Sequence, residues 1–447
     1  MIKEARIVDV EKVAVIGSGN WGTVIARMLG TNVVQQKGFD HEIKMWVFEE
    51  MIGERKLTDL INEKHENIKY LPGIRIPDNI IAVSDILEAA KDATILVIVI
   101  PHQFVRDVCD KLKGKIHPKA KAITLVKGFD TTETGIRPIS HVIKEALKIP
   151  VCSLSGANLA NEIAEEKFSE TTIGYKNRQE GELFKRLFET KYFKVGIVDD
   201  VLGVELCGAL KNVVAIAAGI IDGLKLGDNT KAAVIRIGLL EMKKYIKMFY
   251  KGIKDETFFE SCGIADVITT CYGGRNRKAA EAFIITGKSF EQLEKELLNG
   301  QKLQGTLTAK EIYSVLNRKG LEKEFPLFTT VYRIVFEGLD PHNITFSISR
   351  KKLYTYTSNE ETANETSDDI ELKKKEELSD EEELNILNIC VHTNKRTFWF
   401  ENFKNCAALL SEMFYIFVIG GKVEYKYENM RKVETKNSVE EKAYNVC

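Results

Sequence analysis

Short apolar runs alternate with polar or amphipathic stretches over the first 200 residues of the chain. Each run has the length of a β-strand, and each is followed by helical or loop-like polar sequence. This alternation predicts a doubly wound, Rossmann-like parallel sheet with helices on both faces. The predicted strands are 12–16, 43–48, 94–100, 121–126 and 151–155, with further strands at 171–174 and 193–198.

Strand signals stop at Val201, and long helical patterns take their place. We therefore predict an α/β domain over residues 1–200 and an all-α domain over residues 201–340. The predicted helices are 201–223, 230–250, 277–286, 289–298, 307–318 and 326–337.

The remainder of the chain has a different composition. Residues 359–383 are rich in Glu, Asp, Ser, Thr and Asn, which predicts a disordered acidic linker over 341–383. Residues 384–447 mix aromatic residues with Lys and Asn and include an apolar stretch at 414–419, so their structure stays unassigned. This tail is either a genuine appendage or translated sequence that the mature protein lacks.

Composition excludes several classes of function. A hydrophobic fraction of 44% and a net charge of -1 describe an ordinary soluble protein with no electrostatic case for nucleic-acid binding. The eight cysteines form no Cys-X-X-Cys pair and suit reduced thiols in the cytoplasm, and no cluster has the spacing of metal ligands. The apolar run 201–221 is long enough to span a membrane, but Glu205, Lys211 and Asn212 within it favour a buried helix.

A glycine-rich loop follows the first predicted strand and opens a helix. In this position Gly17 permits a tight turn, Gly19 lets a pyrophosphate approach the backbone, and Gly22 allows close packing of helix and strand. The free N–H groups at the start of the helix favour phosphate. A purely structural glycine turn is the alternative interpretation. The loop consists of Gly17, Ser18, Gly19, Asn20, Trp21 and Gly22.

Two acidic residues, Glu49 and Glu50, follow the second predicted strand. Carboxylates at this point hydrogen-bond ribose hydroxyls and repel a 2′-phosphate, which favours NAD over NADP. More residues than usual separate these carboxylates from the glycine-rich loop, and the polar insertion 35–41 accounts for the extra length. For Glu49 alone, a solvated surface charge is an alternative.

Lys211 and Asn212 lie in the middle of the apolar run 201–221. Because an unpaired ammonium is costly to bury, a lysine at this place indicates a site. We interpret Lys211 as a proton donor and acceptor and Asn212 as a substrate ligand. Asp266 and Thr270 share one helical face, so Asp266 is expected to position Lys211. An ordinary helix N-terminal carboxylate is the alternative for Asp266.

Three further residues complete the predicted chemistry. Arg275 follows Gly273-Gly274, and its fork of donors matches a phosphate, with Asn276 adding amide donors. Lys127 ends a strand and is expected to stabilise negative charge on the substrate oxygen, although a lysine reaching solvent is the alternative. His102, after the strand 94–100, is interpreted as structural rather than as the catalytic base.

These segments together resemble the eukaryotic cytosolic NAD-dependent glycerol-3-phosphate dehydrogenases. The resemblance covers about residues 12–338. It rests on nine short sequence motifs that occur in the same order as in the family and at compatible spacing. They are GSGNWGT at 17–23, MWVFEE at 45–50, PHQF at 101–104, VKGFD at 126–130, SGANLANE at 155–162, ALKNVVA at 209–215, GDNTKAA at 227–233, CYGGRNRKAAEAF at 271–283 and NGQKLQG at 299–305.

The resemblance implies a cytoplasmic enzyme that interconverts dihydroxyacetone phosphate and sn-glycerol 3-phosphate with NAD, and it implies a homodimer. It implies no role for the tail, which departs from the family pattern. Two alternatives are a non-catalytic NADH-sensing protein and a two-domain dehydrogenase for another hydroxy substrate. Beside the glycine-rich loop, the expected cofactor contacts are Phe48, Phe104, Lys127, Ala160 and Arg275, with Lys302 and Gln304 on a closing flap.

Overall fold

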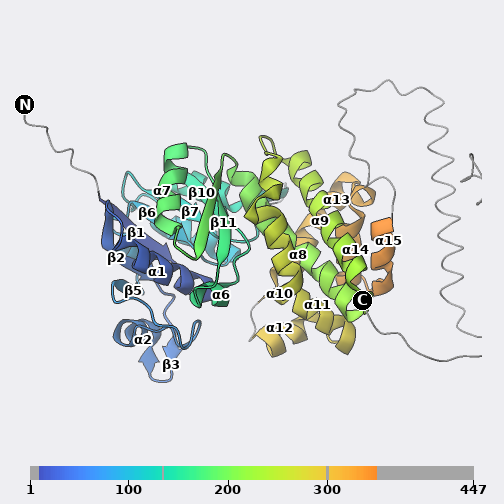
Figure 1. The fold of residues 1–447 in the computed structure, drawn as a ribbon, viewed down its shortest axis with the longest axis horizontal. Coiled ribbons are helices and arrows are strands. Elements are labelled where there is room, and N and C mark those ends of the chain that lie inside the picture. The colour runs from blue at the N-terminus through green and yellow to red at the C-terminus, as the bar shows by residue number, and fades with distance from the viewer. Residues whose placement is uncertain (1–9, 133–134, 299–301, 350–447) are drawn as a thin grey trace, which may run out of the picture. The chain divides into compact units, whose positions relative to one another are not determined.

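An eight-stranded sheet organises the first part of the computed structural model, which describes residues 10–132, 135–298 and 302–349 (Figure 1). The strand order is β12-β11-β10-β7-β6-β1-β2-β5, and neighbouring strands are parallel except β10 and β11. The strands are β1 (Glu11–Ile16), β2 (Phe39–Trp46), β5 (Ile80–Val83), β6 (Ile95–Ile98), β7 (Lys121–Thr124), β10 (Val151–Ser155), β11 (Ser169–Gly174) and β12 (Phe193–Val198).

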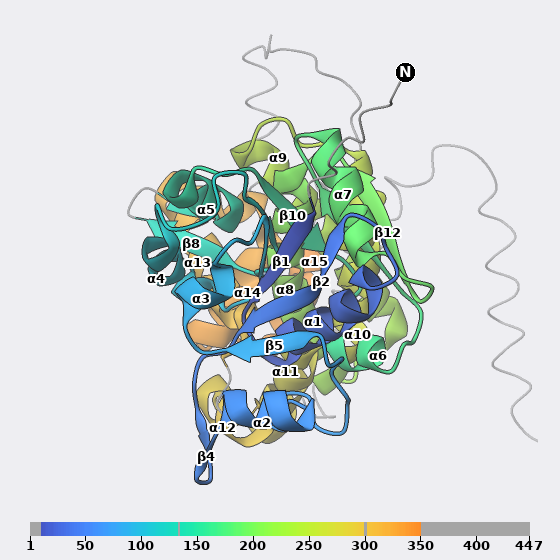
Figure 2. The ribbon, with the colours of Figure 1, turned by 90° about the vertical axis from the view of Figure 1, so that its left-hand side faces the viewer.

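Helices cover both faces of this sheet (Figure 2). Val13 and Val15 of β1 belong to the apolar core beneath α1 and α7, whereas Ala14 and Ile16 belong to the core beneath α3, α4 and α5. Successive strand residues thus enter different cores, as the period of two in a strand requires. The helices are α1 (Asn20–Val33), α2 (Leu57–Lys64), α3 (Ile86–Ala90), η1 (His102–Phe104), α4 (Val105–Leu112), α5 (Ile139–Leu147), α6 (Ala160–Ala164) and α7 (Arg178–Phe188).

The sheet differs from the sequence prediction in three ways. β2 begins at Phe39, four residues earlier than expected, because part of the polar insertion is a half-exposed strand. The edge strand β5, four residues long, was not among the predicted strands. Two small antiparallel hairpins also occur, and β11 runs antiparallel to β10. The hairpins are β3 (Met51–Ile52) with β4 (Arg55–Lys56) and β8 (Phe129–Thr132) with β9 (Gly135–Pro138).

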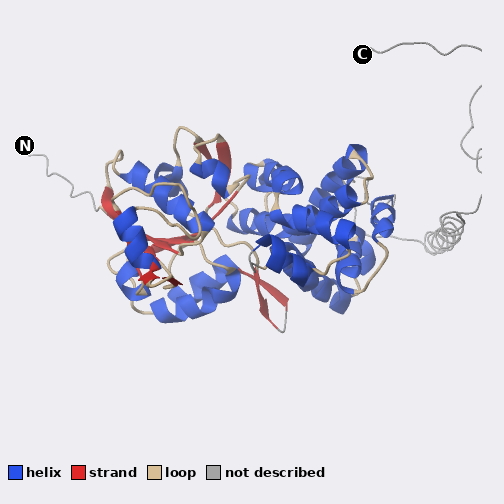
Figure 3. Ribbon diagram, turned by 90° about the horizontal axis from the view of Figure 1, so that it is seen from below, coloured by secondary structure: helices blue, strands red, loops and turns tan. Residues whose placement is uncertain are grey.

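The described residues after β12 contain helices only (Figure 3), as the sequence predicts. The central helix α8 packs against α9, α10, α11, α13 and α14. The elements are α8 (Val201–Gly223), α9 (Asp228–Phe249), η2 (Glu256–Phe259), η3 (Ser261–Ala265), α10 (Asp266–Gly273), α11 (Arg275–Thr286), α12 (Phe290–Leu298), α13 (Gln304–Lys319), η4 (Glu322–Glu324), α14 (Pro326–Phe336), η5 (Pro341–Asn343) and α15 (Ile344–Ser349).

Helix α8 is long and apolar enough to cross a membrane, yet its most apolar window is entirely buried inside the protein. Glu205, Lys211 and Asn212 are buried with it. Their neighbours in the fold are protein atoms, which agrees with the prediction of a buried helix.

The helical region extends past its expected end at residue 340. η5 and α15 occupy positions that the sequence assigns to the start of the acidic linker, and Ile344 is buried in the helical core. The rest of the predicted linker, 350–383, and the tail, 384–447, lie outside the described residues.

Glu241 of α9 connects two helices of this region. It is fully buried, and its two carboxylate oxygens accept the backbone N–H groups of Leu327 and Phe328 at 2.8 and 3.0 Å. These groups belong to the first turn of α14, where a helix offers no internal acceptor. The side chain therefore caps α14 from a neighbouring helix.

We expect Glu241→Ala to destabilise the protein by about 2–4 kcal/mol, because it leaves two buried donors unpaired. Glu241→Gln keeps one acceptor oxygen and should lose less. Thermal unfolding of both variants measures the difference. Equal melting temperatures for Glu241→Ala and the wild type would show that α14 does not depend on this cap.

Candidate active site

The glycine-rich loop lies between β1 and α1. Gly17 has φ +124°, and a Cβ there would collide with the carbonyl oxygen of Val99 on the neighbouring strand's extension. A Cβ on Gly22 would collide with the carbonyl oxygen of Gly17. Among the described residues, no side chain caps the N-terminus of α1, which begins at Asn20. The turn therefore leaves backbone N–H groups at a helix start for an anion, which fits a dinucleotide pyrophosphate.

Asn67 holds this loop in place. It is fully buried and donates hydrogen bonds of 2.9 Å to the Ser18 carbonyl oxygen and to Thr23 Oγ1. Asn20 in turn donates to the Tyr70 carbonyl oxygen at 2.7 Å. Sequence reasoning missed Asn67, because it is 49 residues from Ser18 and stands in an ordinary polar segment.

The carboxylates after β2 have protein partners. Glu49 accepts hydrogen bonds from the backbone N–H and the hydroxyl of Thr58 at the start of α2, and its role toward a ribose stays a prediction. Glu50 is paired with Lys69 and accepts the Tyr70 hydroxyl at 2.6 Å. Burial raises the pKa of Glu50, but these hydrogen bonds outweigh it and lower the pKa overall.

Three residues expected beside the cofactor surround the same edge of the sheet. Phe48 and Phe104 follow β2 and β6 and are 71% and 51% exposed, which is unusual for phenylalanine. Ala160 begins α6, and its neighbour Asn161 accepts a hydrogen bond of 3.1 Å from Asn20 of the glycine-rich loop. Of these three residues, Ala160 thus has a neighbour in contact with the loop, and the cofactor contacts of all three stay predictions.

Lys211 and Asp266 form a buried ion pair. Lys211 lies halfway along α8, Asp266 is the first residue of α10, and their side chains are only 5% and 1% exposed. Thr270 Oγ1 donates to Asp266 Oδ1 at 3.3 Å. Ser155, at the end of β10, donates to the other oxygen at 3.4 Å. The bond of Ser155 to Asp266 was not predicted from sequence, since it joins residues 111 positions apart.

A second ammonium approaches this pair. Lys127 Nζ, after β7, lies 3.8 Å from Asp266 Oδ2, so one carboxylate stands between two lysines. Burial lowers the pKa of Lys211 to about 7, although Asp266 raises it, and the positive charge of Lys127 lowers it further. A lysine titrating near neutral pH can both give and take a proton.

The two asparagines of the predicted substrate site contact each other. Asn276 donates to Asn212 Oδ1 at 2.9 Å, and its own oxygen accepts the Gly305 backbone N–H at 2.9 Å. Asn276 therefore links α8, α11 and the first turn of α13. Arg275, the first residue of α11, is accessible to solvent. Desolvation by the surrounding protein lowers its pKa, and a guanidinium keeps its charge regardless.

The predicted flap residues lie on either side of Leu303. Lys302 is ion-paired with Glu294 at 2.7 Å, and Gln304 opens α13. The middle of the predicted flap, 299–301, lies outside the described residues. The flap motion stays a prediction.

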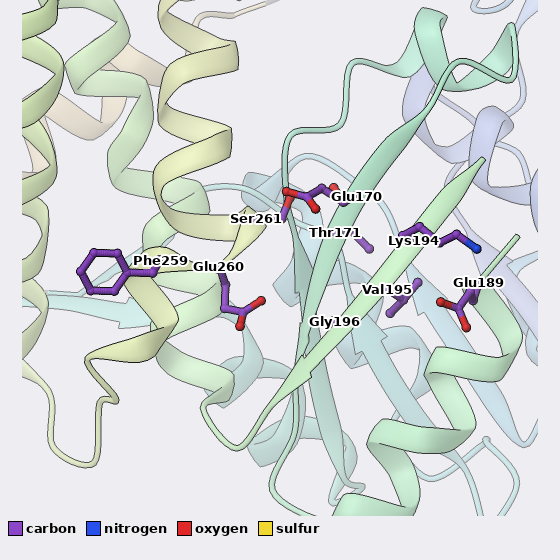
Figure 4. Close-up of a pocket in the computed structure, with 9 residues that line it drawn as sticks. All are labelled: Glu170, Thr171, Glu189, Lys194, Val195, Gly196, Phe259, Glu260 and Ser261. Atoms are coloured by element: carbon purple, nitrogen blue, oxygen red, sulfur yellow. The ribbon is translucent and has the colours of Figure 1, made fainter. Parts of the chain in front are cut away.

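A different pocket, of ≈ 270 Å³, lies beside β11 and β12 (Figure 4). Glu170, Lys194 and Glu260 line it, and no predicted site residue does. Within residues 10–132, 135–298 and 302–349, no group of three or more His, Cys, Asp or Glu side chains is placed to hold a metal ion.

Family models match almost all of the described chain. The N-terminal model of NAD-dependent glycerol-3-phosphate dehydrogenase matches residues 12–181, and the C-terminal model matches residues 200–346. The cytoplasmic glycerol-3-phosphate dehydrogenase [NAD(+)] of Homo sapiens is 57% identical over 329 residues, 73% of this chain and 94% of that protein. Its Drosophila melanogaster counterpart is 55% identical over 337 residues, 75% of this chain and 93% of that protein.

Solved structures agree with this assignment. Glycerol-3-phosphate dehydrogenase from Saccharomyces cerevisiae is 43% identical with a TM-score of 0.72, covering 76% of this chain and all of the other. The Plasmodium falciparum enzyme is 39% identical with a TM-score of 0.73, covering 79% of this chain and 97% of the other. The shared fold confirms the predicted α/β domain and helical domain. The chain is a member of the NAD-dependent glycerol-3-phosphate dehydrogenase family, oxidoreductases whose relatives above are named as cytoplasmic.

Proposed function

We propose that this enzyme reversibly converts dihydroxyacetone phosphate to sn-glycerol 3-phosphate in the cytoplasm, with Lys211 as the general acid and base. The observation that carries the proposal is the buried ion pair of Lys211 with Asp266, in which burial brings the lysine pKa to about 7. NAD(H), when bound, supplies or accepts the hydride.

Lys211 completes the reduction on the substrate. Hydride arriving at the middle carbon turns the carbonyl oxygen into an alkoxide, and Lys211 gives this oxygen a proton and becomes neutral. In the reverse direction, neutral Lys211 takes the hydroxyl proton as the hydride leaves. Asp266 holds Lys211 in place, and the Lys127 ammonium stabilises the negative oxygen.

The remaining residues bind the two ligands. Arg275 offers a planar set of donors to the substrate phosphate, with Asn276, Asn212 and Thr270 around it. The uncapped start of α1 and the crowded Gly17 and Gly22 fit the cofactor phosphates. The other proposed cofactor contacts are Phe48, Phe104, Ala160, Lys302 and Gln304. The homodimer is part of this proposal, and light scattering of the purified protein tests it.

The pH dependence of both directions tests the proton transfer. Reduction needs protonated Lys211, so turnover with dihydroxyacetone phosphate and NADH should fall as pH rises through about 7. Oxidation of glycerol 3-phosphate needs the neutral amine and should rise over the same range. Asp266→Asn removes the charge that raises the lysine pKa, so both transitions should move to lower pH. Transitions that stay in place in Asp266→Asn would show that another group is titrating.

Cofactor choice tests the end of β2. The wild type should prefer NADH strongly over NADPH, because Glu50 repels a 2′-phosphate. Its ion pair with Lys69 also keeps that ammonium from binding the phosphate. Glu50→Gln removes the repulsion and releases the ammonium, so the efficiency ratio of NADPH to NADH should rise about tenfold or more, equivalent to ~1.4 kcal/mol. Glu49→Gln is the matched control, because Glu49 is engaged with Thr58. An unchanged ratio in Glu50→Gln would place cofactor discrimination elsewhere.

A further inference from the structure

Two buried polar atoms at the boundary between the sheet and the helices have no hydrogen-bond partner within the described residues. One is Nδ1 of His102, in the short helix η1 after β6, and the other is Oε1 of Gln304, the first residue of α13. Buried polar atoms are nearly always paired, and each unpaired one costs stability. One atom is a permanent acceptor, and the imidazole nitrogen is a donor when it carries the proton.

Both atoms converge on Gly128. This glycine follows Lys127 directly and has φ +122°. A Cβ on it would lie 2.8 Å from His102 Nδ1 and 3.2 Å from Gln304 Oε1, which is closer than side chains tolerate. Glycine thus allows the imidazole from the sheet side and the amide from α13 to approach the same turn.

Electrostatics favour a neutral imidazole with its proton on Nδ1. Burial lowers the pKa of His102, which keeps the ring uncharged near neutral pH. The contact with Gln304 acts in the opposite direction and raises the pKa, as an acceptor oxygen facing the ring does. A lone pair on Nδ1 would face the lone pairs of Oε1, so the Nδ1–H tautomer is the one that suits this place.

We propose that His102 is a positioning residue whose Nδ1–H donates to Gln304 Oε1, tying η1 and α13 together over the Lys127-Gly128 turn. The link fixes the backbone from which Lys127 reaches Asp266, and it steadies Phe104 at the other end of η1. Its effect on catalysis rests on the proposed function, in which Lys127 stabilises the substrate oxygen. In this structure the two atoms face the same turn without hydrogen-bond geometry, so the link forms by a rotation of the imidazole or of the amide, and it needs no ligand.

The tautomer of His102 tests the link without any turnover. Nitrogen NMR of the ligand-free protein should show a neutral ring protonated on Nδ1, and Gln304→Ala should shift these signals. Melting temperatures provide a second readout. The double variant His102→Ala/Gln304→Ala should lose less than the sum of the two single losses, because either change alone already breaks the pair. Ring signals that Gln304→Ala leaves unmoved, or strictly additive losses, would overturn the link.

Three substitutions of His102 separate positioning from general packing. Asn carries an amide nitrogen close to the position of Nδ1, Gln carries one close to Nε2, and Ala carries none. We expect turnover to fall about 10–100-fold in His102→Ala and His102→Gln, because a displaced Lys127 would stabilise the substrate oxygen less well. Turnover should stay near wild type in His102→Asn. The control is His141→Ala, at an exposed histidine on α5.

The pattern of rescue decides the outcome. Wild-type turnover in His102→Ala, or equal turnover in the Asn and Gln variants, would show that the Nδ1 donor does not position the site. Failure of the proposed function looks different. If Lys211→Ala kept its turnover, the general acid and base would be reassigned. The tautomer of His102 and the melting temperatures of the His102 and Gln304 variants would still test the link independently.

Discussion

Lys211→Ala is expected to lower turnover by about 10²–10⁴-fold, the range in which positioned proton transfer usually contributes. The affinity for NADH should change far less, because Lys211 is buried against Asp266 and is not one of the proposed cofactor contacts. Steady-state turnover at saturating substrate and NADH binding by fluorescence measure the two effects separately. Wild-type turnover in this variant would reassign the proton donor, and His102 would be the next residue to test.

A matched control exists on the neighbouring helix. Lys231 of α9 is also buried, at 5% exposure, and is ion-paired with Asp222 at 2.8 Å. Lys231→Ala therefore breaks a comparable buried pair outside the proposed chemistry. It should lower the melting temperature and leave turnover close to wild type, which separates lost stability from lost proton transfer.

Arg275→Ala should reduce catalytic efficiency toward dihydroxyacetone phosphate by roughly 10²–10⁴-fold. Two charge-assisted hydrogen bonds to a phosphate contribute about 3–6 kcal/mol together. Efficiency toward unphosphorylated dihydroxyacetone should change little, because that substrate lacks the dianion. Arg275→Lys keeps the charge without the planar fork, so it should still raise the Michaelis constant. Turnover should also fall, since the phosphate contact helps orient the reacting carbon.

Arg277 is the control for this experiment. It lies two residues further along α11 and is paired with Asp222 and Glu281 at 3.1 and 2.6 Å. Arg277→Ala removes a guanidinium of the same helix without touching the predicted phosphate site. If Arg275→Ala weakens both substrates equally, the arginine supports the cofactor or the fold, and the phosphate binds elsewhere.

The sequence was sufficient for features that local chemistry determines. A lysine within a long apolar helix has to find a partner, and the predicted pairing of Lys211 with Asp266 is present in the structure. The glycine spacing after β1 likewise predicted a tight turn with close backbone approach, which the structure contains at Gly17 and Gly22. The spacing of hydrophobic residues is also a local property. It changes from short strand-like runs to long helical patterns at Val201, and this change separated the α/β region from the helical region.

Features that depend on contacts between distant parts of the chain could not be predicted from the sequence. Ser155 meets Asp266, and Asn67 supports Ser18, only because the fold brings distant segments together. The engagement of Glu49 with Thr58 could not be read from its place after β2. The antiparallel direction of β11 was equally hidden, since residues 169–174 carry the same apolar pattern in either direction.

The burial of α8 has a consequence for how the enzyme loses activity on heating. Local opening is easiest where backbone hydrogen bonds face solvent, and most of α8 is enclosed by other helices. Lys211 is thus anchored in a segment that exchanges its amide hydrogens only when the helical region unfolds as a whole. The part of the site around Lys211, the proposed acid and base, should resist partial melting, and the loops at the sheet edge should loosen first. Hydrogen exchange of a warming sample would show Phe48 and Phe104 exchanging well before the middle of α8.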